Sequence, residues 1–154
     1  MRTIDRITIH APLDRVFDLA SHVETWPTIL PHYRWVRMLE RRPDGGRVEM
    51  SAWRPFGPSP LRYPAWWVSD MRIDPVGRVI RYRHVAGITT GMDVRWELRD
   101  SAAGVAVEIL HEWTGPAWPL VGRLTADLVI GPVFVHGIAS RTLAGIRRQA
   151  EAAA

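Results

Sequence analysis

The segment 91–99 alternates apolar and charged side chains without a break, which predicts a β-strand with one apolar and one polar face. After a turn over 100–104, the segment 105–113 repeats the pattern, with Glu108 and Glu112 on its polar side. Two such strands joined by a short turn predict an antiparallel hairpin in a sheet that buries only one face. The apolar face carries Met, Trp and His beside Val and Ile. Large amphipathic side chains of this kind are typical of a ligand pocket.

The preceding part of the chain supplies further elements of such a sheet. An alternating strand over 3–10 comes first, and a helix follows from Pro12, a residue that suits the first turn of a helix. Ser21 and Glu24 have the spacing of a capping box, which predicts a second short helix. Further strands are predicted over 33–41, 47–54, 63–73 and 78–85, separated by turns that contain Pro and Gly.

Helical spacing replaces alternation after Pro116. Apolar residues from Leu124 to Ala150 recur at helical intervals, and Pro132 must break or kink this run. We expect a short helix up to about 130 and a long one over 132–151. The fold class is therefore α+β, a curved seven-stranded antiparallel sheet wrapped around a long C-terminal helix, with two short helices after the first strand. Any volume that the long helix leaves unfilled becomes a cavity.

Composition restricts the class of protein. A chain of 154 residues with 47% hydrophobic and 23% charged residues has the size and balance of one folded domain over 1–154. It has no Cys, no apolar leader and no run long enough to cross a membrane, so we expect a cytoplasmic protein without an integral membrane segment. The net charge of +4 rests on dispersed Arg, several alternating with acids on the outer sheet face. We therefore expect no nucleic-acid partner.

Several segments together resemble a known family. They are residues 7–12, 16–20, 23–27, 30–31, 36–40 and 138–143. Through them the sequence resembles the START-like helix-grip superfamily (SRPBCC), particularly its polyketide cyclase/dehydrase branch, which includes the coenzyme Q-binding proteins. The resemblance implies a single START-like domain whose hydrophobic cavity holds a polyketide, an isoprenoid quinone or another lipid. It also implies cyclisation or aromatisation in some members and binding alone in many, and it transfers no catalytic residue to this chain.

Strand parity selects candidate residues for the cavity wall. Arg81 and Arg83 should point outward, which places Tyr82 and His84 on the inner face. The same argument applies to the other strands, and the terminal helix adds two residues. The predicted ligand-binding set is Met50, Arg54, Tyr82, His84, Met92, Trp96, His111, Trp113, Phe134 and Ile138. Of the adjacent Trp66 and Trp67 only one can face the cavity, and the pattern does not say which. Trp26 is expected to fill the core.

The polar members of this set have two interpretations. They could orient a carbonyl or phenol or transfer a proton, since His titrates near neutral pH. Alternatively, each is a wall residue satisfied by a neighbour or by water. We expect no metal site, because Glu108 and Glu112 have the opposite parity from His111. No cofactor is expected either, and His10 and His32 are expected at the surface or in caps.

Two functions remain open from the sequence. The first is binding of a bulky hydrophobic small molecule in the cavity, and the second is a polyketide cyclase, aromatase or dehydratase that uses polar pocket residues. An interaction module has no specific support, although exposed Trp side chains would allow a homodimer. The segment 55–61 is expected to be the longest loop between strands. As a lid it would place Phe56 at the cavity mouth, and the alternative is an ordinary surface loop.

Overall fold

The chain forms one sheet and several helices in a computed structural model that describes residues 1–56, 59–115 and 135–152, with the side chains of 55, 56 and 59–61 excepted. Along the chain the elements are β1 (Arg2–Ile9), α1 (Leu13–Ser21), the 3-10 helix η1 (Val23–Thr25), α2 (Trp26–Ile29), β2 (Tyr33–Arg42), β3 (Gly45–Phe56), β4 (Ser59–Asp74), β5 (Val79–Gly87), β6 (Asp93–Ser101), β7 (Gly104–Glu112) and α4 (His136–Glu151).

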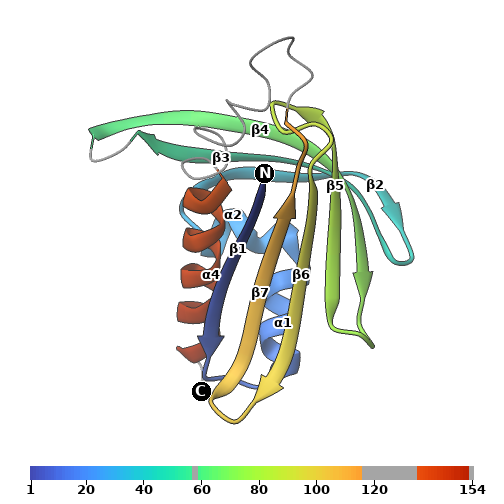
Figure 1. Cartoon of the computed structure of the whole chain (residues 1–154), viewed down its shortest axis with the longest axis vertical. Coiled ribbons are helices and arrows are strands. Elements are labelled where there is room, and N and C mark those ends of the chain that lie inside the picture. Colours follow the sequence, from blue (N-terminus) through green and yellow to red (C-terminus); the bar gives the residue numbers. More distant parts are fainter. Residues whose placement is uncertain (57–58, 116–134, 153–154) are drawn as a thin grey trace.

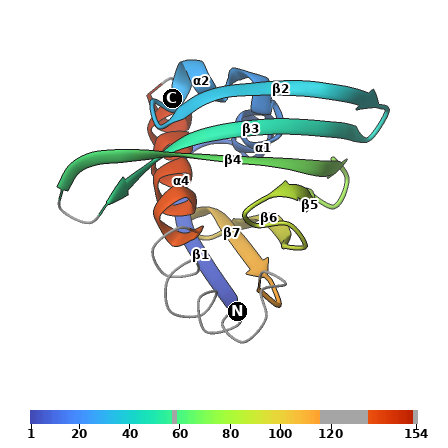
Figure 2. The same ribbon diagram turned by 90° about the horizontal axis from the view of Figure 1, so that it is seen from above.

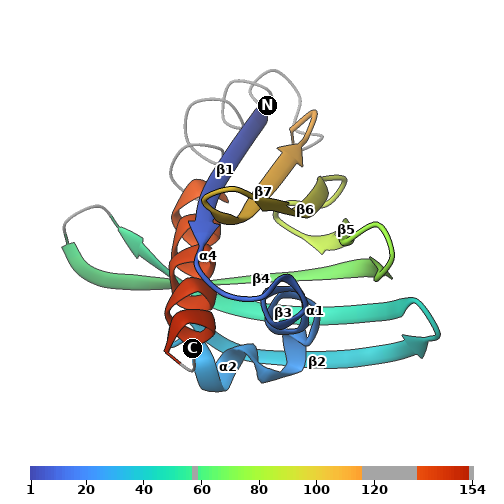
Figure 3. The same cartoon turned by 90° about the horizontal axis from the view of Figure 1, so that it is seen from below.

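The seven strands form a single antiparallel sheet in the order β1-β7-β6-β5-β4-β3-β2. The sheet curves, and α4 lies along its concave side (Figures 1 and 2). Helices α1 and α2 both contact α4, and Figure 3 shows them near its C-terminal end. The predicted α+β helix-grip architecture, with two short helical segments after the first strand, is confirmed.

The core lies between the concave sheet face and the helices. Val16, Phe17 and Ala20 share one side of α1, and all three are buried. On α4 the spacing of Ala139, Leu143 and Ile146 creates an apolar stripe that faces the sheet. The helices are therefore held by burial of one apolar face.

The outer face of the sheet is polar and its charges are paired. Arg6 on β1 hydrogen-bonds Glu108 on β7 at 2.6 Å, and Arg47 on β3 bonds Asp70 on β4 at 2.8 Å. These pairs are exposed or half-buried, so each contributes little to stability. Among the described residues, no helix is both long enough and apolar enough to cross a membrane.

The segment 55–61 is not the long loop that its proline content predicts. Strand β3 continues to Phe56 and β4 begins at Ser59, and these two residues pair. Strand β2 pairs with β3 only as far as Ala52, and β5 pairs with β4 only from Trp67 onward. The end of this hairpin is thus two-stranded, and Pro is tolerated where an N–H would point to solvent. The Phe56 side chain lies outside the described residues.

The predicted capping box at Ser21 is also wrong. Ser21 closes α1 instead of starting the next helix, and its hydroxyl donates to the Asp18 carbonyl at 3.3 Å. The N-cap residue of η1 is His22, without a side-chain cap hydrogen bond. At the other end of the chain, the short helix expected up to about 130 lies outside the described residues, and α4 is described from His136.

Candidate functional site

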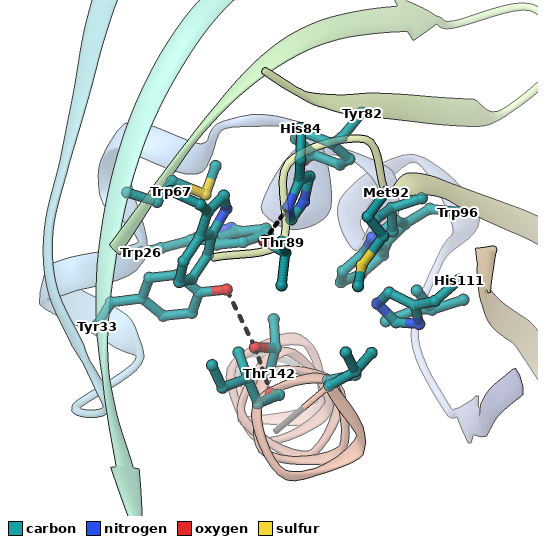
Figure 4. A pocket seen from close by; sticks show the side chains of 16 residues that line it. Trp26, Tyr33, Trp67, Tyr82, His84, Thr89, Met92, Trp96, His111 and Thr142 are labelled. Atoms are coloured by element: carbon teal, nitrogen blue, oxygen red, sulfur yellow. Dashed lines mark hydrogen bonds between the residues drawn. The ribbon is translucent and has the colours of Figure 1, made fainter. Parts of the chain in front are cut away.

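A cavity separates α4 from the concave face of the sheet. Its empty space is about 560 Å³, counted with the solvent at its open side, and the centre of a water molecule can occupy about 70 Å³ of it. Five aromatic residues form much of the wall: Trp26, Tyr33, Trp67, Tyr82 and Trp96 (Figure 4). Aliphatic residues from the sheet and α4 fill the rest. The polar members are His84, Thr89, His111 and Thr142.

The structure places most of the predicted ligand-binding residues on this wall. The predicted residues that line the cavity are Met50, Tyr82, His84, Met92, Trp96, His111 and Ile138. Phe134 lies outside the described residues. Arg54 and Trp113 are not among the lining residues.

The two exceptions have separate physical reasons. Arg54 pairs with Tyr63 near the end of the β3–β4 hairpin, beyond the last β3 residue that pairs with β2. This end of the hairpin extends past α4 (Figure 1), so correct parity does not bring the side chain to the cavity. Trp113 follows the end of β7 and is buried. Its indole N–H donates to the Thr90 carbonyl at 3.0 Å, so the ring closes the turn between β5 and β6. Alternation along a strand predicts the face of the sheet to which a side chain points. It does not predict how far the opposite helix extends.

Trp67, and not Trp66, faces the cavity. Trp66 is 42% exposed, and its indole N–H donates to Glu49 Oε1 at 2.8 Å on the outer face. Trp67 is buried and stacks against His84, with ring centroids 6.1 Å apart and an interplanar angle of 8°. The Trp67 ring thus contributes a flat apolar surface, and the His84 imidazole lies parallel to it.

Trp26 is a wall residue as well as a core residue. Its indole N–H donates to the Leu19 carbonyl at 2.9 Å, which fixes the ring at the end of the cavity near α1. The ring meets Tyr33 edge-on, with centroids 5.0 Å apart, and lies 5.8 Å from Trp96. Sequence analysis placed Trp26 in the core because a residue in a short helix has no strand parity to indicate a cavity.

One cluster of polar side chains at this wall combines residues from two distant parts of the chain. On α4, the Thr142 hydroxyl lies 2.9 Å from the Ile138 carbonyl, 3.4 Å from the Tyr33 hydroxyl and 3.0 Å from His32 Nε2. His32 is therefore not a surface residue as expected, but half-buried. Burial lowers its pKa to about 4, helped by the charges of Arg141 and Arg148. Such a link between positions 110 residues apart has no local signal.

Both cavity histidines are uncharged at neutral pH. Burial lowers the pKa of His84 to about 3, with smaller contributions from His111 and Arg83. Burial alone lowers the pKa of His111 to about 4. His84 Nδ1 lies 2.6 Å from the Thr89 hydroxyl. A neutral imidazole has one nitrogen with a free lone pair, so each ring can accept a hydrogen bond or a proton.

Tyr82 lines the cavity, and its hydroxyl is enclosed by the protein. Its oxygen is buried and has no hydrogen-bond partner among the described residues. Burial raises the pKa of Tyr82 far above its ordinary value, so the group is a phenol that can donate. In Figure 4 it lies beside His84 at the upper side of the cavity. An unsatisfied hydroxyl in an apolar wall is suited to a polar atom of a ligand.

Asp5 is a buried acid next to the cavity that sequence analysis did not select. It faces inward from β1 and bonds Nδ1 of His136, in the first turn of α4. Its second oxygen, Oδ2, lies 4.0 Å from Nδ1 of His111. Burial raises the pKa of Asp5, and the contact with His136 opposes this rise. Parity with Ile7 and Ile9 could have identified an inward carboxylate.

Comparisons with known proteins agree with the fold and the cavity. Residues 9–130 match the family model "Polyketide cyclase / dehydrase and lipid transport". A protein of Streptomyces halstedii, named as a candidate polyketide cyclase, is 31% identical over 104 residues, which cover 67% of this chain and 92% of the relative.

Solved structures show the same fold. The Zhui aromatase/cyclase of Streptomyces sp. R1128 has a TM-score of 0.75 at 20% identity, over 98% of this chain and 93% of that one. A START superfamily protein of Mycobacterium smegmatis has a TM-score of 0.69 at 13% identity, over 99% of both chains. The START-like fold that the sequence indicates is thereby confirmed.

Proposed function

Because this chain belongs to the polyketide cyclase/dehydrase and lipid transport family, we propose that its cavity binds a hydrophobic small molecule of the polyketide class. The observation that carries the proposal is the wall itself, in which aromatic faces surround a few polar groups. Flat ring systems pack well against such faces, and isolated polar groups fix their orientation.

The dimensions of the cavity restrict the ligand. The space open to water centres, about 70 Å³, corresponds to several water molecules. Only part of a ring system therefore fits among Trp26, Trp67 and Trp96, and the rest of the molecule would extend through the open side. The Tyr82 hydroxyl would donate to a carbonyl or phenol oxygen, and the neutral His84 and His111 would accept from a phenol.

Filling the cavity from α4 should abolish this binding. Ala139 lines the cavity, whereas Ala144 on the same helix does not, so Ala139→Leu and Ala144→Leu form a matched pair. We expect Ala139→Leu to raise the Kd of 2-naphthol and 1,8-dihydroxyanthraquinone at least about tenfold, because the added carbons occupy ring space. Tryptophan fluorescence measures both titrations. Equal affinities in the two variants, with both folded, would show that the probes bind elsewhere.

A second candidate function is cyclisation with loss of water, favoured by the unsatisfied Tyr82 hydroxyl and the two neutral histidines. The low pKa values of His84 and His111 make them weak bases, so a hydrogen-bond donor at the ketone oxygen would have to assist removal of the proton from the carbon between two ketones. That carbon then bonds to a carbonyl carbon further along the chain. The proton goes to the new alkoxide. Removal of a second proton and departure of the hydroxyl as water give the conjugated ring. A phenol donor at the carbonyl oxygen would stabilise the developing charge.

Removing the Tyr82 hydroxyl separates this reaction from binding. In Tyr82→Phe we expect kcat for a synthetic poly-β-ketone thioester to fall about tenfold or more, with KM changed less than threefold. Stability should hold or rise, because the hydroxyl has no partner among the described residues. Tyr63→Phe is the control, since Tyr63 is 61% exposed. Chromatography with mass spectrometry counts cyclised product, and undiminished turnover in Tyr82→Phe would exclude this role.

We also propose that the protein is cytoplasmic and that two copies can pair through an exposed tryptophan. Trp66, on the outer face of the sheet, is 42% exposed and is the candidate among the described residues. Light scattering of the purified chain, compared with Trp66→Ser, tests whether two copies pair through this residue.

A further inference from the structure

A line of three titratable side chains runs from solvent to the cavity beside β1. At its outer end His136 is largely exposed, and its Nδ1 bonds Oδ1 of Asp5. Asp5 is buried on the inner face of β1, and its Oδ2 lies 4.0 Å from Nδ1 of His111 on β7. The His111 ring lines the cavity (Figure 4).

The two inner groups, Asp5 and His111, face each other and could pair as hydrogen-bond acceptor and donor. Within the described part of the chain, neither Asp5 Oδ2 nor His111 Nδ1 has a hydrogen-bond partner, and both atoms are buried. Leaving two such atoms unpaired is strongly unfavourable. The 4.0 Å separation is longer than a hydrogen bond, and a side-chain movement of about 1 Å would form one.

His136 fixes the carboxylate that His111 faces. By holding Oδ1 from the first turn of α4, it directs Oδ2 toward β7. Thr3 on the same strand is the register partner of His111, and its hydroxyl is also buried without a partner among the described residues. The charged and titratable groups around Asp5 are therefore His136 from α4 and His111 from β7, with no competing cation in contact with it among the described residues.

We propose that Asp5 is a positioning residue that holds the His111 imidazole in the tautomer protonated at Nδ1. The bond from His136 favours the ionised form of Asp5 against the effect of burial, and an ionised carboxylate only accepts hydrogen bonds. Nδ1 of His111 then donates to it, and the lone pair of Nε2 is offered to a ligand. Carboxylates orient metal-binding and catalytic histidines in the same way. The inference rests on the proposed function, because the direction of Nε2 matters only if the cavity holds a ligand.

Nitrogen NMR of the histidine rings tests the proposal directly. In the wild-type chain at pH 7.5 we expect His111 to be protonated at Nδ1. In Asp5→Asn the ratio of the Nδ1–H to the Nε2–H tautomer should fall about tenfold, because an amide oxygen accepts more weakly than a carboxylate. Asp100→Asn, an exposed change on β6, should leave the ratio unchanged. A purely structural role for Asp5 would not move the tautomer of a folded variant.

Several outcomes would overturn the proposal. A wild-type His111 protonated at Nε2 would exclude it without any variant, which keeps the test valid if Asp5→Asn does not fold. An unchanged tautomer in folded Asp5→Asn would exclude it as well. Titration with 2-naphthol separates it from the proposed function. If the wild type does not bind the probe, the proposed function fails, whereas the tautomer measurement still decides the role of Asp5.

Discussion

Acidification from pH 6.5 to about 4 is expected to lower the free energy of unfolding by roughly 3 to 6 kcal/mol, enough to unfold a domain of ordinary stability. The cause is the burial of uncharged imidazoles, those of His84 and His111 in the cavity wall and that of the half-buried His32. The pKa of His84 is lowered to about 3 and that of His111 to about 4, from an ordinary value of 6.5. Each unit of difference between the folded and unfolded chain corresponds to about 1.4 kcal/mol.

The direction of this effect follows from proton uptake. Below pH 6.5 the unfolded chain binds protons at these three histidines and the folded chain does not, so acid favours unfolding until pH reaches the folded values. Above pH 6.5 both states are neutral at these rings, and their contribution is constant. Asp5 acts in the opposite direction, because its pKa is raised on folding, and it reduces the total loss.

Glutamine variants test whether the loss of stability in acid comes from the cavity histidines. Urea unfolding of the wild type, His84→Gln and His111→Gln at several pH values gives the slope of stability against pH. Each glutamine variant should lose about a third of the slope between pH 6.5 and 4.5, because His32 also contributes, and His10→Gln, an exposed control, should keep it. A flat profile in the wild type over this range would contradict the burial of neutral imidazoles.

The fold was predictable because its signals are local. Alternation in β6 and β7, turns with Pro and Gly, and the helical spacing of the last segment each follow from a few neighbouring residues. Only one arrangement lets a one-sided sheet and a long helix bury their apolar faces together. Proline in 55–61 predicts a loop, but the β3–β4 hairpin continues there because neither β2 nor β5 pairs with its end among the described residues.

The cavity was only partly predictable, because parity gives the side of a strand and not its surroundings. Parity predicted His84 and His111 on the wall, where both lie, but it predicted Arg54 there as well, and Arg54 is not a lining residue because it pairs with Tyr63 near the end of the β3–β4 hairpin. The contact of His32 with Thr142 depends on how α2 and α4 pack, which no local pattern encodes. The remaining lining residues come together only in the tertiary structure.

Gly87→Ala is expected to lower the free energy of unfolding by about 3 kcal/mol or more and to disturb the Trp67 wall. Gly87 has φ +94°, and a Cβ there would lie 2.4 Å from the Trp66 carbonyl oxygen and 2.9 Å from the Trp67 Cα. Both are backbone atoms of β4, the strand paired with Gly87, so they cannot rotate away. The substitution therefore combines backbone strain with a steric clash, and relief requires β4 to move.

Gly91→Ala separates the two contributions, because Gly91 has nearly the same φ, +90°, and its nearest neighbour would be Trp113 Nε1 at 3.8 Å. Only strain applies there, so we expect a loss of about 1 kcal/mol. Urea unfolding at pH 7.5 measures both losses, and 2-naphthol titration should show weaker binding in Gly87→Ala alone, since Gly87 is the register partner of Trp67. Equal losses in the two variants would mean that strain dominates and that β4 accommodates the methyl group, in which case the close backbone approach does not fix the position of Trp67.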